Sequence, residues 1–453
     1  MKLRLTQNIN STDVIAWNEN ESISHQQFLI DVILLVNKLP NKNFAINLCE
    51  ERYSFMVAFA AVIVKEQTNL LPQSRVIENV MAVAEEYPDC YVISEEFINN
   101  LELEQVGVVY QHSENSTSEN QEQRLIPMIS SEHIAAIAFT SGSTGKPQPN
   151  TKTWGALVSG AKMAAQRFDL IRSPVHIVAT VPPQHMYGLE TSILYSMQNG
   201  CPSYTGRPFY PDDIRSAVES TKSAVILITT PVHLRACNAA VNIKWKNIKY
   251  VISATAPLRV DLAQEVSKKL NTRIMEIFGC TEAGAIASRE PAISEVWNLY
   301  NGVTIHSEQN KTILNAVDII ENLELSDVIQ IIDEQHFKLL GRDSDMVNIA
   351  GKRGSLADLT MKLQSIEGID DAVVFFPENE NEVNRLVALV ITKTLTTKEI
   401  SAELAKKVDS VFIPRPIYCV DKLPYNETGK LIQQKLNDMI VHARNSQSQG
   451  ITQ

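Results

Sequence analysis

Residues 139–147 read Phe-Thr-Ser-Gly-Ser-Thr-Gly-Lys-Pro. The apolar run at 134–139 predicts a buried strand that leads into this stretch. Gly142 and Gly145 allow backbone angles closed to other residues, and successive N–H groups in such a loop form a concave anion site. The stretch therefore indicates a cradle for nucleotide phosphates, although solvated turns share this composition. Further donors are supplied by Thr140, Ser141, Ser143, Thr144 and Lys146.

This loop is not a Walker A motif. A Walker A motif needs a longer gap between its first glycine and its Gly-Lys pair than the two residues that separate Gly142 from Gly145. Pro147 also stands where that motif has Ser or Thr. Phosphate binding here would therefore use a different loop.

The composition is that of a globular protein. The chain has 453 residues, 44% hydrophobic and 21% charged, enough for roughly two or three domains. The net charge of -11 argues against nucleic-acid binding, which needs a basic face. Six cysteines lie without Cys-x-x-Cys spacing, and the start of the chain has no signal-peptide pattern. The longest apolar runs are too short to span a bilayer, so we expect a cytoplasmic protein with free thiols and no membrane span.

Helical and strand patterns alternate along most of the chain. Ser24 can cap a helix, and the helix expected over 53–64 is apolar nearly all round, which is typical of a buried helix. Such alternation predicts an α/β layered domain. The expected helices are 24–39, 53–64 and 154–168, and the expected strands are 43–48, 175–181, 224–229, 250–254 and 273–278.

A second polar motif, Phe-Gly-Cys-Thr-Glu-Ala-Gly, occupies 278–284 after an expected strand. Ligands of open α/β sheets bind at the carboxyl ends of strands. The Thr281 hydroxyl and the Glu282 carboxylate suit a phosphate oxygen and a Mg²⁺ ion, which takes oxygen ligands. A helix N-terminus capped by Thr281, with Glu282 beside the helix dipole, is an equally simple interpretation.

The last third of the chain predicts a smaller domain. Residues 324–341 have the pattern of a hairpin, and a charged break follows it. We expect a domain at 1–343, a hinge at Ser344 and Asp345, a second domain at 346–441, and a disordered tail at 442–453.

The motifs, in this order and at these separations, resemble the adenylate-forming (ANL) superfamily of acyl-CoA synthetases, adenylation domains and luciferases. The loop at 141–147 is similar to the family's Ser-Gly-[Ser/Thr]-Thr-Gly-x-Pro, and 278–282 to its Tyr-Gly-x-Thr-Glu. Asp327 and Arg342 have the spacing of its ribose-binding Asp and its Gly-Arg-x-Asp. Weaker or shorter matches are Pro-x-x-His-x-x-Gly at 182–188, Gly-x-Arg at 351–353 and Pro to Gly-Lys at 424–430.

The resemblance implies a fold and a reaction. The fold is α/β, with a large layered N-terminal domain of sheets and helices and a small mobile α+β C-terminal domain. A carboxylate attacks the α-phosphate of ATP to give an acyl-adenylate and pyrophosphate, and a thiol then displaces AMP. ATP and Mg²⁺ are the implied cofactors, and catalysis rests on positioning and electrostatics.

The resemblance also implies site residues. Thr140 to Lys146 would hold the β- and γ-phosphates, Thr281 would contact the α-phosphate, and Glu282 would hold the metal. Phe278 would stack on adenine, with Gly279 beside it. The remaining implied roles are adenine contact by Ala256 and Pro257, ribose binding by Asp327 and Arg342, an acyl pocket bordered by His185 and Gly279, and catalysis by Lys430 from the small domain.

Several details depart from the family or narrow it. Pro147-Gln148-Pro149 replaces the usual Pro-Lys-Gly, so Lys152 would supply the missing cation, and Ser344 replaces a common hinge Asp. Together with 49–53 and 67–72, the loop is similar to the stand-alone ligases of aryl polyene and xanthomonadin-like pigment clusters. That similarity implies an aromatic acid passed to an acyl carrier protein. Coenzyme A as acceptor, and a binding module without turnover, stay as alternatives.

Overall fold

The computed structural model describes residues 1–7, 13–108, 126–141, 147–170, 175–241, 243–309, 311–342, 346–349, 352–377, 385–425, 431–432 and 434–440. The chain divides into two compact units, Met1–Thr304 with Leu314–Leu323, and Ile305–Ile313 with Glu324–Gln453. The expected hinge at Ser344 and Asp345 and the expected tail at 442–453 lie outside the described residues, so they stay predictions.

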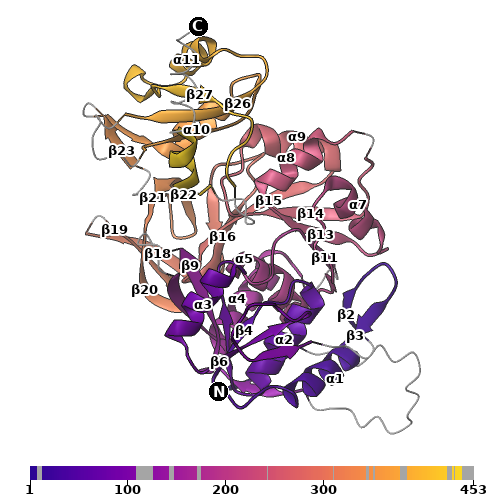
Figure 1. Cartoon of the computed structure of the whole chain (residues 1–453). Helices are drawn as coiled ribbons and strands as arrows, with labels where there is room; N and C mark the ends of the chain where they lie inside the picture. The colour runs from indigo at the N-terminus through magenta and orange to yellow at the C-terminus, as the bar shows by residue number, and fades with distance from the viewer. Residues whose placement is uncertain are drawn as a thin grey trace. The chain divides into compact units, whose positions relative to one another are not determined.

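A six-stranded sheet forms the first layer of the larger unit (Figure 1). Its strands are parallel except β10, which pairs antiparallel with β9 at one edge. Helices α2 (Arg52–Val64) and α3 (Ile77–Glu86) connect its strands, and α1 (His25–Val36) leads into β4 from the other sheet. The sheet order is β10 (Pro147–Thr153), β9 (Ile134–Ser141), β5 (Thr68–Leu71), β4 (Phe44–Asn47), β6 (Cys90–Ser94) and β7 (Gln105–Gly107).

The two helices expected near the N-terminus are confirmed. Ser24 caps α1, because its side chain accepts a hydrogen bond from the backbone N–H of Gln27 at 3.1 Å. Helix α2 is buried on every side, as its apolar sequence indicates, and it packs in the largest hydrophobic cluster with Phe28 and Val32 of α1. Two short strands, β1 (Lys2–Arg4) and β8 (Met128–Ser130), pair beside them.

A second, larger sheet forms the other layer of the same unit. Its central strands β15, β14, β13, β11, β12 and β2 are parallel, and antiparallel strands flank them. Helices α7 (Pro211–Glu219), α8 (Pro231–Ala239) and α9 (Val260–Leu270) cover one face through a shared apolar cluster (Figure 1). Within the unit the order is β17 (Trp297–Leu299), β16 (Gly284–Arg289), β15 (Arg273–Cys280), β14 (Ile248–Ser253), β13 (Val225–Thr229), β11 (His176–Ala179), β12 (Ser203–Tyr204), β2 (Val14–Trp17) and β3 (Ser22–Ser24).

A continuous helical segment follows β11. It begins as α5 (Met186–Gly188), widens into the π-helix η1 (Leu189–Leu194) and ends as α6 (Tyr195–Asn199). It packs against α4 (Trp154–Arg167). Short π-helical turns inside helices occur often at functional sites.

The smaller unit contains the hairpin that the sequence predicts. Strands β21 (Asp327–Ile331) and β22 (His336–Arg342) pair antiparallel, and Asp327 lies opposite Arg342. Two small sheets follow, β23 (Met346–Ile349) with β24 (Lys352–Ser355), and β25 (Ile369–Phe375) with β26 (Val387–Thr392) and β27 (Ile417–Cys419). The described helical segments of this region are α10 (Leu356–Gln364), α11 (Thr397–Ala405), η3 (Ser410–Phe412) and residues 434–440. The three-stranded sheet of β18 (Val303–Glu308), β19 (Lys311–Ala316) and β20 (Ile320–Leu325) has residues in both units.

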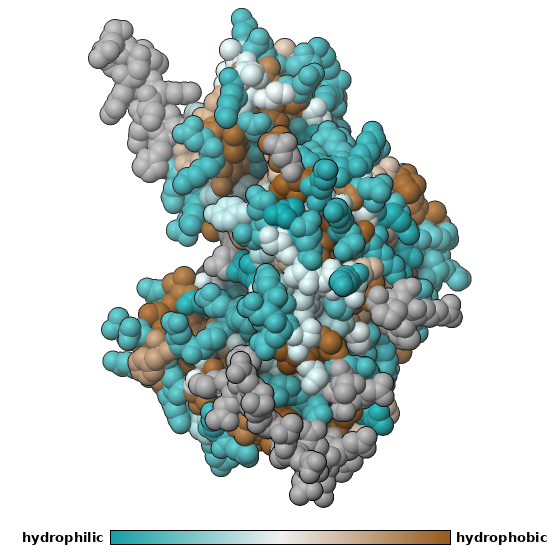
Figure 2. All heavy atoms as spheres, turned by 90° about the vertical axis from the view of Figure 1, so that its right-hand side faces the viewer, coloured by the Kyte–Doolittle hydropathy of each residue, from teal (hydrophilic) through white to brown (hydrophobic). Residues whose placement is uncertain are grey.

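The predicted fold class is therefore confirmed. The described part of the chain contains no helix long and apolar enough to cross a bilayer. The face drawn in Figure 2 is mainly hydrophilic with separate apolar areas, and exposed large apolar side chains are scattered, such as Phe97, Tyr210, Val241 and Ile293.

Candidate active site

The Gly-rich loop joins two paired strands. Strand β9 ends at Ser141 and β10 begins opposite it at Pro147; residues 142–146, which include most of the predicted phosphate loop, lie outside the described residues. Strand β9 is parallel to β5, so the loop leaves the carboxyl edge of the sheet, where ligands of such sheets bind. Thr140 is partly exposed at this edge, and its Oγ1 lies 3.5 Å from Nδ2 of Asn150.

The Thr281 and Glu282 motif is a turn between antiparallel strands. Strand β15 ends at Cys280 and β16 begins at Gly284, so the alternative of a helix N-terminus capped by Thr281 is wrong. The Glu282 side chain is exposed and Thr281 is partly exposed. Both therefore stand at the carboxyl end of a central strand with access to a ligand.

Lys152 of β10 joins the two motifs. Its Nζ donates a hydrogen bond to the carbonyl oxygen of Glu282, although the side chain is only 4% exposed. Burial lowers the pKa of Lys152, and the negative field of Glu190 opposes that shift. Lys152 lies opposite Ala136, at the end of the hairpin away from the Gly-rich loop, so its cation lies against the backbone of the turn.

Glu190, in the π-helix η1, holds the other side of the same turn. Its carboxylate accepts a hydrogen bond from the backbone N–H of Ala285, with Oε2 at 3.1 Å. Desolvation raises the pKa of Glu190 to about 7, while Lys152 and the Ala285 N–H oppose the rise. Gly284 has a φ of +75°, a conformation that favours glycine, and a Cβ there would lie 2.0 Å from Glu190 Oε1, so a larger residue would displace this carboxylate. No sequence motif marks Glu190; its one signal is a lone carboxylate in the mostly apolar run at 186–197.

The predicted adenine-binding residues lie on neighbouring strands. The Phe278 ring is 5.6 Å from the Trp297 ring, and the Arg289 guanidinium lies 4.7 Å above Trp297. Ala256 and Pro257 belong to the loop after β14. That loop is tied to β15, because Glu276 Oε1 accepts a hydrogen bond from the N–H of Leu258 at 2.8 Å. Gly279 follows Phe278 in β15 and is exposed.

The Pro-x-x-His-x-x-Gly stretch folds over the carboxyl ends of β13 and β14. His185 precedes α5, and the hydroxyl of Tyr187 donates to the carbonyl oxygens of Thr229 at 3.0 Å and Ile252 at 2.9 Å. A Cβ on Gly188 would lie 1.9 Å from the carbonyl oxygen of Pro182. The glycine of this motif is therefore required by packing.

The Cys-Glu-x-Arg-Tyr stretch at 49–53 is structural. The buried Arg52 guanidinium donates to the carbonyl oxygens of Ala179 at 2.9 Å and Val181 at 3.0 Å, and also contacts Ser192 Oγ. Arg52 thereby joins α2 to the end of β11 and to η1.

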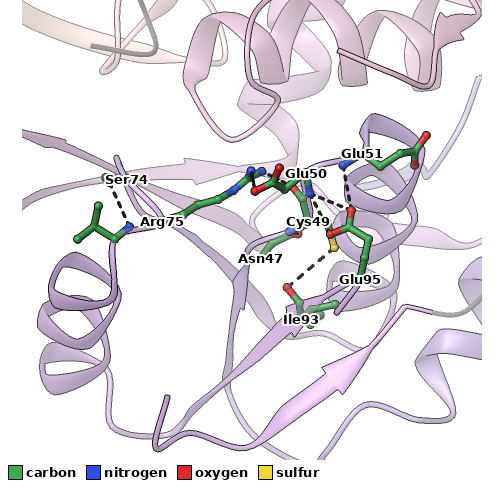
Figure 3. A network of polar contacts seen from close by, with 9 residues as sticks. Asn47, Cys49, Glu50, Glu51, Ser74, Arg75, Ile93 and Glu95 are labelled. Atoms are coloured by element: carbon green, nitrogen blue, oxygen red, sulfur yellow. Dashed lines mark hydrogen bonds and ion pairs between the residues drawn. The ribbon is translucent and has the colours of Figure 1, made fainter. Parts of the chain in front are cut away.

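Figure 3 shows the polar network beside this stretch. Glu95 accepts from the backbone N–H groups of Glu50 and Glu51, at 2.8 and 2.9 Å, and Arg75 pairs with Glu50 at 2.9 Å. Burial raises the pKa of the Cys49 thiol well above its usual range. These groups hydrogen-bond and pair with one another at the start of α2, so we assign the network a structural role.

The remaining predicted residues belong to the smaller unit. Asp327 and Arg342 lie opposite each other in the β21–β22 hairpin, so their sequence spacing corresponds to a spatial pair. Lys430, Ser344 and Asp345 lie outside the described residues.

A divalent metal could bind Glu282 together with the phosphates of a nucleotide. Among the residues that the structure describes, there is no group of three or more His, Cys, Asp or Glu side chains that could hold a metal alone. Mg²⁺ commonly binds through one or two carboxylates together with substrate phosphates. The exposed Glu282, in the turn that Lys152 of β10 contacts, has this chemistry.

The chain belongs to the family of AMP-binding enzymes. The model of that family matches residues 51–312, more than half of the chain. This match spans the Gly-rich loop, the stretch at 182–188 and the Thr281–Glu282 turn.

Individual relatives are distant. The chain is 21% identical to 4-coumarate–CoA ligase-like 6 of Arabidopsis thaliana, over 71% of this chain and 65% of that protein. It is 22% identical to a 3,4-dihydroxybenzoate–[aryl-carrier protein] ligase of Bacillus anthracis, over 68% of this chain and 74% of the relative. The fold matches the O-succinylbenzoate coenzyme A synthetase of Bacillus subtilis in complex with ATP and magnesium ion, with a TM-score of 0.80, 16% identity, and coverage of 95% and 98% of the two chains.

Proposed function

We propose that this protein activates a carboxylic acid with ATP, through an acyl-adenylate, and transfers the acyl group to a phosphopantetheine thiol. The observation that carries the proposal is the Lys152 bond to the Glu282 carbonyl, since it joins the Gly-rich hairpin to the Thr-Glu turn. Membership of the AMP-binding family supports the same reaction.

In this proposal each residue acts on charge that develops at phosphorus. The N–H groups and hydroxyls at 140–146 bind the β- and γ-phosphates, and Thr281 contacts the α-phosphate. Glu282 holds Mg²⁺ together with the phosphates. Phe278 stacks on adenine against Ala256 and Pro257, and Gly279 leaves room for the acid beside His185.

The remaining proposed roles belong to residues of the smaller unit. Asp327 accepts the ribose hydroxyls, with Arg342 opposite it, and Lys430 neutralises charge at the reacting carboxylate and phosphate. Ser344 and Asp345 serve as the hinge that removes Lys430 before the thiol enters. These roles rest on the family resemblance.

We propose an aromatic acid as substrate and an acyl carrier protein as acceptor, within aryl polyene biosynthesis. Relatives named for coumarate and dihydroxybenzoate support an aromatic acid. One of them is named for an aryl-carrier protein and the other for coenzyme A, so free coenzyme A is the second candidate acceptor.

The experiment has two stages. Purified protein is first screened with carboxylic acids for exchange of pyrophosphate into ATP; exchange with at least one acid is expected. No exchange with any acid would favour the third candidate, a nucleotide-binding module without turnover, which Gln148 suggests. AMP release with the best acid is then compared with coenzyme A and with holo carrier protein. Acceleration by coenzyme A alone would refute the carrier-protein assignment.

A further inference from the structure

Buried polar atoms without a hydrogen-bond partner gather at one edge of the larger sheet. Of the twelve such side-chain atoms among the described residues, four lie there: Gln184 Oε1, His233 Nε2, Ser253 Oγ and Thr255 Oγ1. They follow or end the adjacent strands β11, β13 and β14, at the carboxyl edge where α/β sheets bind ligands. Buried polar groups in native proteins almost always have a hydrogen-bond partner. We therefore expect these atoms to bond a group that the described residues do not supply, such as a bound ligand.

Strand register places hydroxyls side by side at this edge. Thr229 of β13 lies opposite Ser253 of β14, and residues in register on parallel strands share a face. The Oγ1 of Thr180, just after β11, is 3.0 Å from that of Thr229. The edge is therefore polar, in contrast to the aliphatic residues that precede Thr229 and Ser253 in their strands.

His233 is the member of this group with the most specific chemistry. It lies in the first turn of α8, directly after β13, and is 7% exposed. Its Nδ1 is 3.0 Å from Thr230 Oγ1, and the Phe209 ring packs edge-on at 5.1 Å. One ring nitrogen thus has a partner within the fold, and Nε2 has none among the described residues.

The imidazole is neutral at pH 7. Burial, and then the positive field of Arg207, lower the pKa of His233 to about 4. A neutral imidazole has one donor nitrogen and one acceptor nitrogen, and Thr230 can serve either. A hydroxyl can also donate or accept, so it satisfies Nε2 in both tautomers, whereas an alkyl or unsubstituted aryl group satisfies it in neither.

We propose that His233 is a specificity-determining residue, whose Nε2 hydrogen-bonds a hydroxyl group on the acid, and that the substrates are hydroxylated aromatic acids. This inference rests on the proposed function and adds the substrate class to it. A site built to hydrogen-bond a hydroxyl rejects the analogue without it far more strongly than an apolar pocket can.

The test compares matched acids by pyrophosphate exchange. The pairs are 4-hydroxybenzoate with 4-methylbenzoate, which has a methyl group in place of the hydroxyl, and 4-hydroxycinnamate with cinnamate. For the better pair, the parent protein is expected to favour the hydroxylated acid on the order of 100-fold or more in kcat/KM. His233→Leu is expected to reduce that preference to within about tenfold, by slowing the hydroxylated acid and sparing its partner.

His176→Leu is the matched control. His176 also bonds a threonine, with Nδ1 2.9 Å from Thr221 Oγ1, and burial also lowers its pKa to about 4. It lies at the opposite, amino end of β11, so its replacement is expected to leave the preference unchanged. His233→Gln, which keeps a hydrogen-bonding group, is expected to keep part of the preference, and exchange with the non-hydroxylated acid verifies that each variant is folded.

The outcomes separate this inference from the proposed function. Exchange by the parent protein with both members of each pair at similar kcat/KM would overturn the assignment of His233 and leave acid activation intact. An undiminished preference in folded His233→Leu would overturn it as well. Absence of exchange with every carboxylic acid would instead refute the proposed function itself.

Discussion

Replacing Lys152 with Met tests whether the Thr281–Glu282 turn must be held from β10. The substitution keeps an unbranched side chain in a buried position but removes the ammonium group that donates to the Glu282 carbonyl. It also removes the cation that opposes the upward pKa shift of Glu190. Both effects weaken the contacts that hold the turn, and this turn carries Glu282, the proposed metal-binding carboxylate.

The loss of the hydrogen bond from Lys152 to the Glu282 carbonyl determines the expected fall in activity. A hydrogen bond to a charged group contributes about 1.5–3 kcal/mol, and about 1.4 kcal/mol corresponds to a factor of ten. If the turn transmits that loss to Glu282, kcat/KM for pyrophosphate exchange falls about 10- to 100-fold. The Mg²⁺ concentration for half-maximal exchange should rise on the order of tenfold, because the carboxylate is less well placed.

The assay is a Mg²⁺ titration of pyrophosphate exchange, together with urea unfolding. Lys65→Met is the matched control, because Lys65 Nζ also donates to backbone carbonyls, those of Leu39 at 2.6 Å and Val36 at 3.3 Å. That control should lose stability without a change in Mg²⁺ dependence. Identical Mg²⁺ titrations for Lys152→Met and the parent protein would refute the reasoning.

Three other perturbations have definite expected results. The pKa of Glu190 is raised to about 7 from 4.5, so between these pH values the folded state keeps a proton that the unfolded chain has released. The folded state therefore loses stability as pH rises from about 4.5 to 7. In urea unfolding at several pH values, Glu190→Gln should remove at most about 3 kcal/mol of this pH dependence, and equal pH slopes for the variant and the parent protein would contradict the expectation. Gly188→Ala should destabilise the fold by about 3 kcal/mol or more in the same assay, because of the 1.9 Å approach to Pro182, whereas Gly107→Ala, with nothing within 4 Å, should not. Lys430→Ala should slow adenylation about 100-fold while calorimetry still detects ATP binding, and unchanged exchange would count against its catalytic role.

Local sequence patterns were sufficient for most helices and strands. The capped helix after Ser24, the buried helix α2 and the parallel strands have strong period or composition signals, and each is confirmed. The spacing of Asp327 and Arg342 also had a direct physical meaning, because a hairpin register places them opposite each other.

Strand β10 was missed for a physical reason. Its sequence, Pro-Gln-Pro-Asn-Thr-Lys-Thr, is polar and has two prolines, which predict a loop. Proline is tolerated in a sheet at an edge strand, where its missing N–H costs no ladder bond. Strand β10 is such an edge, and only the tertiary structure shows that its neighbour is β9.

Contacts between distant segments were also beyond the sequence. Glu190 bonds a backbone N–H of Ala285, 95 positions away, and no local pattern encodes that partner. The turn at 281–283 resembles a helix start because a Thr hydroxyl can cap a helix and can also hydrogen-bond within a turn. The antiparallel pairing of β15 and β16 decides between them.

The π-helix at Leu189–Leu194 has a consequence for how this scaffold can vary. A π turn contains one residue more than the α turn it replaces, and each residue advances a helix by roughly 100°. Loss of a single residue there would yield a regular helix with the same ends, yet Glu190 would be rotated away from Ala285. A length change of one amino acid in this buried segment would thus connect or disconnect the turn at 281–283 from Glu190.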